Sequence, residues 1–434
     1  MKTLSLRMIG LLLLLNFNLM AQTNDSTVQN NCPAQLTIFY PIGSNGIQSA
    51  KISNNVSLNL FAGYNEGVNG IEIGGFSNTI RHDLQGIQIA GFSNVVLGKS
   101  EGIQISGFSN FNKGTYKGCQ ISGFSNAIND SSLVTQISGF SNLVNGSGQG
   151  IQLCGFSNVV NAEFQGVQIA GFSNLTKGKM MGSQISGFSN LVVDTACLVQ
   201  ISGISNMVKG NTNGVQISGF SNVSSGDLTG VQLSGFINMA QKVNGCQIGF
   251  INLSDTFESG LPIGFFSYVK NGFRSLDVSY DESQFANLSF NTGTDRFYNI
   301  FTVGANFSNN EIIWQGGYGI GTKINLGRKF DLNFEAISYN MYKDYWDYID
   351  QFYEYDDYEY TILNKLRINA SWKIVKHLQL FGGISYNVLV SNEKDSEGNF
   401  DNYDFIPWTT GFYEGNYNVV NMYPGLNIGI RFTN

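Results

Sequence analysis

The chain has 434 residues, of which 42% are hydrophobic, 13% aromatic and only 13% charged. Soluble domains carry roughly 25% charged residues, so this composition is poor in charge, and its apolar and aromatic content excludes a charged disordered chain. With a net charge of −7, the chain lacks the basic surface of a nucleic-acid-binding protein, and we expect no nucleic-acid partner.

The first expected element is an export signal over residues 1–21. Lys2 and Arg7 supply positive charge, an apolar run begins at Ile9, and Ala21 is a small residue at the expected cleavage point. The apolar run is shorter than the ~20 residues of a membrane-spanning helix. We therefore expect an exported protein in which residues 22–55 form a lead-in to the next segment.

A repeat of 16 residues occupies residues 56–262. Its glutamine recurs every 16 positions from Gln88 to Gln232, and a glycine follows three residues later; Glu72 holds the same place one unit earlier. Alternation around the glycine predicts one β-strand per unit, followed by a turn. Glycines at fixed turn offsets, such as Gly98 and Gly102, predict positive φ angles.

Two all-β architectures satisfy this period. In a β-solenoid, each unit is a coil and Gln104 lies beside Gln120. In an antiparallel meander continuous with a barrel, Gln104 lies beside Asn126. Uniform turns at both strand ends cancel the stagger that a closed barrel accumulates, which favours the solenoid.

The repeated polar and aromatic residues are interpreted as ladders inside the stack rather than as an exposed ligand-binding face. Stacked amides and stacked rings hold neighbouring strands in register. The residues of these expected structural ladders in the first three complete units are Gln88, Gly91, Phe92, Asn94, Gln104, Gly107, Phe108, Asn110, Gln120, Gly123, Phe124 and Asn126.

Residues 263–434 are predicted to form an antiparallel, outer-membrane-type β-barrel. Apolar and polar residues alternate at 330–336, 366–374, 378–388 and 426–432, which is typical of strands with lipid outside and a polar interior. A soluble β-sandwich with one buried face per sheet is the alternative. The charge-poor composition, the export signal and the aromatic final strand favour the barrel.

An acidic and aromatic segment at 344–360 is a candidate external loop, and 391–417 is similar in character. Clustered carboxylates could bind Ca²⁺ and exposed rings could stack on a glycan, although a solvated loop without a ligand has the same composition. The candidate loop residues are Tyr345, Trp346, Asp350, Asp356 and Asp357.

Catalytic motifs are absent from the sequence. It contains no G-x-S-x-G, H-E-x-x-H or Walker A segment, and only His82 and His377 could serve as a histidine base. The five cysteines form no C-x-x-C pair; one disulfide is compatible with export, but no metal site or cofactor is expected. The prediction is a non-enzymatic protein.

The repeat resembles that of a family of bacterial surface-repeat proteins, exported by diderm bacteria. The resemblance rests on GVQIAGFSN at 166–174 and departs from the motif at Cys154 and Ile204. It implies a location and a repeat type, without an activity. Flanking segments that look similar to the entry, the exit and a final outer-membrane strand are 56–64, 261–264, 271–273 and 423–432.

From these features we expect a non-enzymatic outer-membrane protein at the cell surface, with a structural, adhesive or ligand-capturing role. The alternative is an outer-membrane channel or transporter whose repeats are themselves barrel strands. The expected partners are the outer membrane and a surface ligand or glycan, and the sequence leaves the oligomeric state open.

Overall fold

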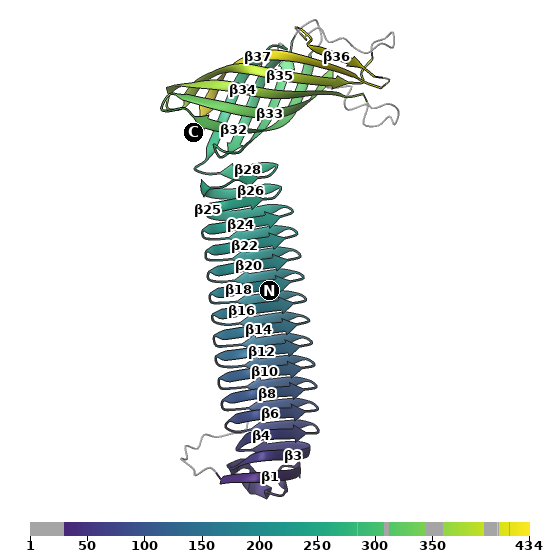
Figure 1. Cartoon of the computed structure of the whole chain (residues 1–434), viewed down its shortest axis with the longest axis vertical. Coiled ribbons are helices and arrows are strands. Elements are labelled where there is room, and N and C mark those ends of the chain that lie inside the picture. Colours follow the sequence, from purple (N-terminus) through teal and green to yellow (C-terminus); the bar gives the residue numbers. More distant parts are fainter. Residues whose placement is uncertain are drawn as a thin grey trace.

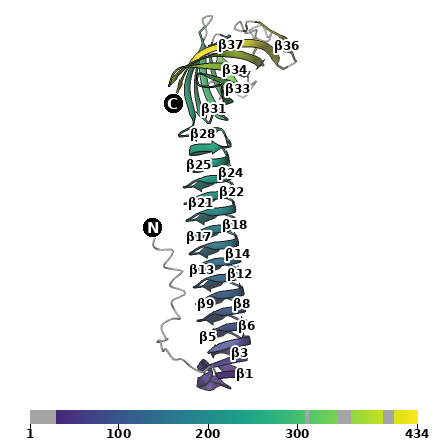
Figure 2. The same cartoon turned by 60° about the vertical axis from the view of Figure 1, so that its left-hand side comes forward.

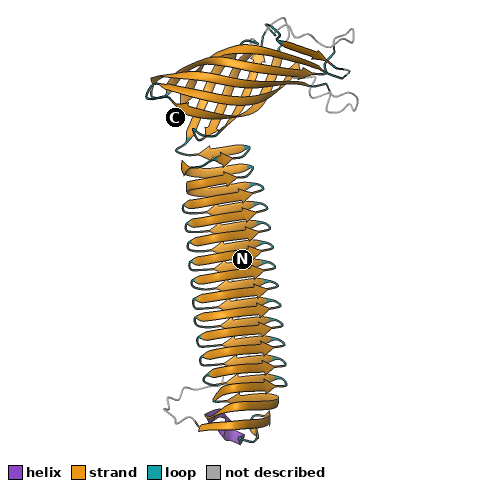
Figure 3. Ribbon diagram, in the orientation of Figure 1, coloured by secondary structure: helices purple, strands orange, loops and turns teal. Residues whose placement is uncertain are grey.

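The computed structural model describes residues 30–283, 285–307, 312–343, 359–394, 406, 408–415 and 417–434. These residues form a long solenoid of about 14 coils, whose last coil leads into a closed antiparallel β-barrel (Figure 1). Nearly all regular structure is β-strand (Figure 3). The predicted export signal and the five candidate loop residues of 344–360 lie outside the described residues.

Each of the regular coils contains a strand of seven residues and a strand of four, as in β6 (Leu84–Ala90) and β7 (Ser93–Val96). The two strands face each other across a thin interior. Figure 2 shows the four-residue strands from β5 to β21 on one side of the rod and the seven-residue strands from β6 to β24 on the other. Each strand pairs in parallel with its equivalent in the next coil, so Gln104 is the register partner of Gln120. The predicted solenoid is confirmed, and the meander is wrong.

The equivalent seven-residue strands are β8 (Ser100–Ser106), β10 (Tyr116–Ser122), β12 (Ser132–Ser138), β14 (Gly148–Cys154), β16 (Phe164–Ala170), β18 (Met180–Ser186), β20 (Ala196–Ser202), β22 (Thr212–Ser218) and β24 (Leu228–Ser234). The equivalent four-residue strands are β9 (Ser109–Asn112), β11 (Ser125–Ile128), β13 (Ser141–Val144), β15 (Ser157–Val160), β17 (Ser173–Thr176), β19 (Ser189–Val192), β21 (Ser205–Val208) and β23 (Ser221–Ser224).

Parallel pairing extends beyond residues 56–262 at both ends. β1 pairs with β3 at the first end, and β26 pairs with β28 at the other. The elements at the first end are β1 (Asn30–Phe39), β2 (Ile42–Gly43), the 3-10 helix η2 (Gly46–Lys51), β3 (Ile52–Asn65), β4 (Gly67–Gly74) and β5 (Ser77–Ile80). Those at the other end are β25 (Ile237–Ile248), β26 (Ile251–Ser259), β27 (Pro262–Ile263) and β28 (Phe266–Val269).

The turn glycines follow two different rules, which corrects the expectation of positive φ angles at both offsets. Gly102 has a φ of 138° but lies inside β8 rather than in a turn. Gly98 lies in a turn without a positive φ; there a Cβ atom would lie only 2.3 Å from the carbonyl oxygen of His82 in the preceding coil. Close stacking of successive turns, and not left-handed backbone, therefore requires glycine at that position.

The barrel strands are β29 (Phe273–Asp281), β30 (Phe285–Gly293), β31 (Tyr298–Asn306), β32 (Ile313–Asn325), β33 (Phe330–Lys343), β34 (Thr361–Val375), β35 (Leu378–Ser391) and β37 (Val419–Thr433). Each is antiparallel to its neighbours, and pairing of β29 with β37 closes the ring. The short strand β36 (Gly411–Glu414) pairs with the start of β37. An eight-stranded ring has an interior that side chains can fill.

Candidate functional site

The repeated glutamines form a continuous hydrogen-bonded column in the solenoid interior. The Nε2 of Gln104 donates to Oε1 of Gln88 at 2.9 Å, and Gln120 donates to Gln104 at 2.7 Å. These side chains are fully buried. Because each amide satisfies the next, the column removes the cost of burying polar groups and holds the coils in register.

The repeated asparagines form a second buried column that also links the two sheets of the solenoid. Asn94 donates from Nδ2 to Oδ1 of Asn110 at 3.0 Å and to the backbone carbonyl of Ile105 at 2.8 Å. One side chain thereby contacts the neighbouring asparagine and the opposite sheet.

Glu72 ends the glutamine column. Its carboxylate accepts hydrogen bonds from Gln88 at 2.9 Å, from Asn59 at 3.0 Å and from Asn65 at 2.6 Å. Burial raises the pKa of the Glu72 carboxyl from 4.5 to about 7, although these hydrogen bonds oppose the shift. The side chain is fully buried, so no substrate can reach this group.

The phenylalanines stack in register, but outside the solenoid, which corrects the expectation that they form an internal ladder. Phe92 and Phe108 stack with ring centroids 4.7 Å apart and planes 2° apart. Phe92 keeps 40% of its surface exposed. The turn at Gly91 and Phe92 lies between the two strands, so the phenylalanine projects from the edge of the coil instead of following Gln88 inward.

Groups that could support catalysis are scattered. His82 lies 3.1 Å from Glu66 at a solenoid turn, whereas the Nδ1 of His377 contacts the carbonyl of Thr433 at the end of the barrel. Within the described ranges, no group of three or more potential metal ligands was found. The five cysteines are free thiols, so the disulfide that the sequence allowed does not form here.

The barrel has an apolar outer wall and a polar interior. On β29, Leu276 and Val278 point outward with 44% and 48% of their surfaces exposed, whereas Asp277 between them is 4% exposed. The same alternation continues through the outward-facing residues Leu288, Phe290, Leu366, Ile368, Trp372, Leu380, Ile384, Leu426, Ile428 and Ile430. A barrel that folds in water would bury its apolar face instead.

Ion pairs lie inside the barrel, in two centres. Arg431 contacts Asp277 at 2.7 Å and Glu335 at 3.3 Å, and Arg367 contacts the same glutamate at 2.9 Å. Lys365 forms a second centre with Asp281 at 2.6 Å. Pairing of each charge offsets the cost of removing it from water.

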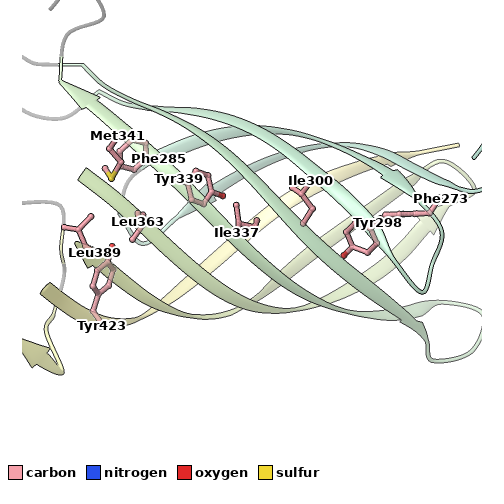
Figure 4. Close-up of a cluster of buried hydrophobic side chains, with 10 residues drawn as sticks. All are labelled: Phe273, Phe285, Tyr298, Ile300, Ile337, Tyr339, Met341, Leu363, Leu389 and Tyr423. Atoms are coloured by element: carbon pink, nitrogen blue, oxygen red, sulfur yellow. The ribbon is translucent and has the colours of Figure 1, made fainter. Parts of the chain in front are cut away.

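Apolar side chains fill both ends of the same interior (Figure 4). Phe273 and Tyr298 lie at the end next to the solenoid. The other end holds Phe285, Met341, Leu363, Leu389 and Tyr423. Together with the ion pairs, these residues leave a packed interior rather than a wide channel.

The two barrel ends differ in their connections. At the end where β29 begins and β37 stops, the strands are joined by the short segments 294–297, 326–329 and 376–377. At the opposite end, the connections include the long segments 344–360 and 392–418. The solenoid joins the barrel at the short-turn end.

The last solenoid coil also packs against the outer wall of the barrel. Asn299 donates to the carbonyl of Gly264 at 2.7 Å, and the hydroxyl of Tyr318 donates to the same oxygen at 3.1 Å. Phe265 contacts the rings of Phe301 and Tyr318, with centroids 5.4 Å and 4.8 Å away. The phenylalanine column of the solenoid therefore continues directly into aromatic residues of the barrel wall.

Sequence reasoning identified the glutamine and asparagine columns and the polar-inward barrel pattern, but not the ion-pair partners or the outward position of the phenylalanines. Charged residues are confined to one turn of the repeat, and this pattern in the sequence could have distinguished the two edges of the coil.

Among the described residues, no helix has the length and hydropathy needed to cross a membrane. Comparisons with protein-family models, with curated proteins and with solved structures found no match.

Proposed function

We propose that this chain is a non-enzymatic outer-membrane protein in which the barrel is the membrane anchor and the solenoid is a structural scaffold. The apolar outer wall of the barrel carries this proposal. In lipid, a closed ring of strands satisfies every backbone hydrogen bond, and outward apolar side chains contact the acyl chains. The proposed relationship to bacterial surface-repeat proteins is supported by the stacking of 16-residue units.

The arrangement of the connections supports an orientation. Membrane barrels of bacteria have short turns on the periplasmic side and long loops outside. On this basis the solenoid lies on the periplasmic side, and the segments 344–360 and 392–418 face the exterior. An adhesive role would then rest on these segments and not on the repeats.

The channel alternative is weakened by the barrel interior. Eight strands enclose a space that side chains can fill, and here the ion pairs of Arg431 and Lys365 are combined with apolar residues at both ends. The repeats are coils and not barrel strands, so they add nothing to the width of the barrel.

Ligand capture at the long-segment end is a second candidate, and exposed aromatic residues favour it. Trp408, Phe412, Tyr413 and Tyr417 expose 51%, 61%, 66% and 86% of their surfaces. Exposed rings of this kind stack on sugars. A glycan array probed with the purified protein tests the candidate, and the absence of any bound glycan would remove it.

The anchor is tested by substitution of Val278 with arginine on the outer wall. Arginine facing lipid costs about 2–4 kcal/mol near the middle of a bilayer, whereas an exposed arginine in water is tolerated. V278R should therefore fold into phospholipid vesicles far less completely than the parent, as judged by the heat-dependent shift of the folded band on a gel. The matched control is Thr115→Arg at an exposed solenoid turn, which should behave as the parent.

Cell fractionation and conductance complete the test. The parent should be recovered with the outer membrane and should give no discrete conductance steps in a planar bilayer. Recovery in the soluble periplasmic fraction, or equal folding of V278R and the parent, would refute the membrane anchor. Reproducible conductance steps would instead support the channel.

A further inference from the structure

Charge is confined to one edge of the solenoid. Across residues 66–240, every Asp, Glu, Lys and Arg except Glu72 lies at the edge where one coil leads into the next seven-residue strand. In the last coils, Lys242, Asp255 and Glu258 lie at the equivalent place within the continuous strands β25 and β26. We call this the charged edge; between β7 and β8 it is formed by residues 97–101, and between β9 and β10 by residues 113–117. The opposite edge, where the phenylalanines stack, is called the phenylalanine edge.

An apolar band borders the phenylalanine edge on both faces of the rod. On the seven-residue strands, the outward positions equivalent to 87 and 89 are mostly isoleucine, valine or leucine. On the four-residue strands, the outward position equivalent to 95 is also mostly apolar. Half-buried serines equivalent to Ser93 separate these columns, and no charged residue occurs among them.

The size of this band fits one leaflet of a bilayer. Three residues of extended strand separate positions 87 and 90, which corresponds to about 10 Å at ~3.3 Å per residue, and the phenylalanine rings project beyond the strand end. The hydrocarbon core of a bilayer is about 30 Å thick, so one leaflet contributes about 15 Å. Fourteen coils spaced by ~4.8 Å give a band about 65 Å long, and each face exceeds the roughly 300–600 Å² of the largest apolar patch on a typical monomer.

The backbone at the phenylalanine edge is suited to an environment without water. The amides of Phe108 and Ser109 donate to the carbonyl of Phe92 at 2.8 Å and 3.1 Å, and Gly107 donates to Ala90 at 3.3 Å. The edge therefore continues the hydrogen-bonded stack from coil to coil. Irregular backbone that faces lipid without such partners would cost several kcal/mol per group, on the order of a lost hydrogen bond in hydrocarbon.

The barrel fixes the direction in which the two edges face. At the last coil, the charged edge lies at the short-turn end of the barrel, where Asn434 donates to the carbonyl of Gly272. The phenylalanine edge lies farther along the outer wall, where Phe265 contacts Phe301 and Tyr318. Figure 1 shows the rod running across the barrel rather than continuing its axis. A membrane around the barrel would thus meet the phenylalanine edge along the rod.

We propose that the solenoid lies in the plane of the membrane, with its phenylalanine edge immersed in the acyl chains of the short-turn leaflet and its charged edge in water. This inference rests on the proposed membrane anchor. The partner is a lipid surface because the band covers both faces and the edge and is continuous with the barrel wall. A second copy packed face to face would cover one face only.

Tryptophan fluorescence in vesicles with brominated acyl chains tests the proposal on the full chain. Phe124→Trp and Phe172→Trp place an added ring on the phenylalanine edge, and Lys113→Trp and Lys177→Trp place one on the charged edge of the same coils. The native tryptophans, including Trp372 on the barrel wall, are subtracted with the parent protein as reference.

The added signal of the two edge variants should fall at least about twofold in brominated vesicles, because immersed apolar faces lie about 5–10 Å deep. The added signal of the two lysine variants should be unchanged. Quenching of the parent together with no quenching at positions 124 and 172 would overturn this inference and leave the membrane anchor intact. No quenching of the parent would refute the anchor itself.

Electron microscopy of the parent in large nanodiscs provides a test without substitutions. A rod in the membrane plane should add no density beyond the disc on the short-turn side except the thin charged edge. A projection about 65 Å long, at ~4.8 Å per coil, would overturn the proposal, and paired rods in cross-linked samples would identify a second copy as the partner.

Discussion

Replacement of Asn126 by alanine tests whether the buried amide columns hold the solenoid together. Asn126 is 1% exposed, and its Nδ2 donates to Asn142 at 3.0 Å and to the carbonyl of Ile137 at 2.9 Å. Its Oδ1 accepts from Asn110 at 2.9 Å. The same Nδ2 also lies 3.3 Å from the backbone carbonyl of Gln120, and alanine removes all four contacts at once.

The expected cost follows from the groups that lose a partner. Three acceptors lose a donor and one buried donor loses an acceptor, at about 1–3 kcal/mol for each group left unsatisfied. Asn110 keeps its bond to the carbonyl of Ile121, so we expect a total of about 3 kcal/mol, nearer the low end for each group. This is about a 100-fold change in the equilibrium for local opening, since ~1.4 kcal/mol is a factor of ten.

Amide hydrogen exchange measured by mass spectrometry reads this opening coil by coil. Each coil contacts only its neighbours, so the loss of protection in N126A should be largest over residues 116–144 and absent from β24. Ser125→Ala, on the half-buried outer face of the same strand, should change the opening free energy by less than about 0.5 kcal/mol. Asn126→Asp keeps the shape but removes the donors and adds a buried charge, so it should cost more than alanine.

Two results would refute this reasoning. Protection in N126A within about threefold of the parent would mean that the column contributes little, since ~1.4 kcal/mol is a factor of ten. Equal protection in Asn126→Asp and the parent would mean that the amide hydrogens are not needed as donors.

Three further perturbations address other parts of the molecule. Because the pKa of Glu72 in the folded chain is raised to about 7, the first coils should be most stable below pH 4.5 and should lose stability as the pH rises to about 7. Glu72→Gln should abolish this dependence of stability on pH, measured by urea titration. Stability that rises with pH over this range would contradict the prediction. Gly139→Ala places a Cβ atom 2.1 Å from the carbonyl oxygen of Gly123, so exchange protection of that coil should collapse. Ser141→Ala, on the half-buried outer face of the same coil, should be tolerated. Similar protection in both variants would exclude the steric explanation. Arg431→Met leaves buried Asp277 without its cation and leaves Glu335 paired with Arg367 alone, so it should lower barrel stability by about 3–5 kcal/mol. The loss should appear as a lower temperature of the gel shift, and an unchanged temperature would contradict the role of the ion pairs.

The period of the repeat was sufficient to predict the solenoid. A strict spacing of 16 residues places equivalent residues of successive units side by side only if every coil has the same conformation as the one before it. Gln104 indeed pairs with Gln120. The same sequence misled about Phe92, because alternation counted through Gly91 assumes a straight strand. The chain turns at that glycine, so the alternation begins again at Ser93 and the phenylalanine lies on the edge.

Pairings across the barrel were beyond the reach of local pattern. Asp277 and Arg431 are 154 residues apart, and only the pairing of β29 with β37 brings them to 2.7 Å. Alternation shows that such residues face inward, but not which inward-facing charge each will contact.

The sequence by itself determined the repeat length, the strand-by-strand alternation and the absence of charge from most of the solenoid, since these depend on spacing along the chain. Only the tertiary structure decided that the barrel closes, that its interior is filled, and that the phenylalanine edge lies against the barrel wall. Those features depend on contacts between residues distant in the chain, whose register is fixed by hydrogen bonding across the closed sheet and by packing at Phe265.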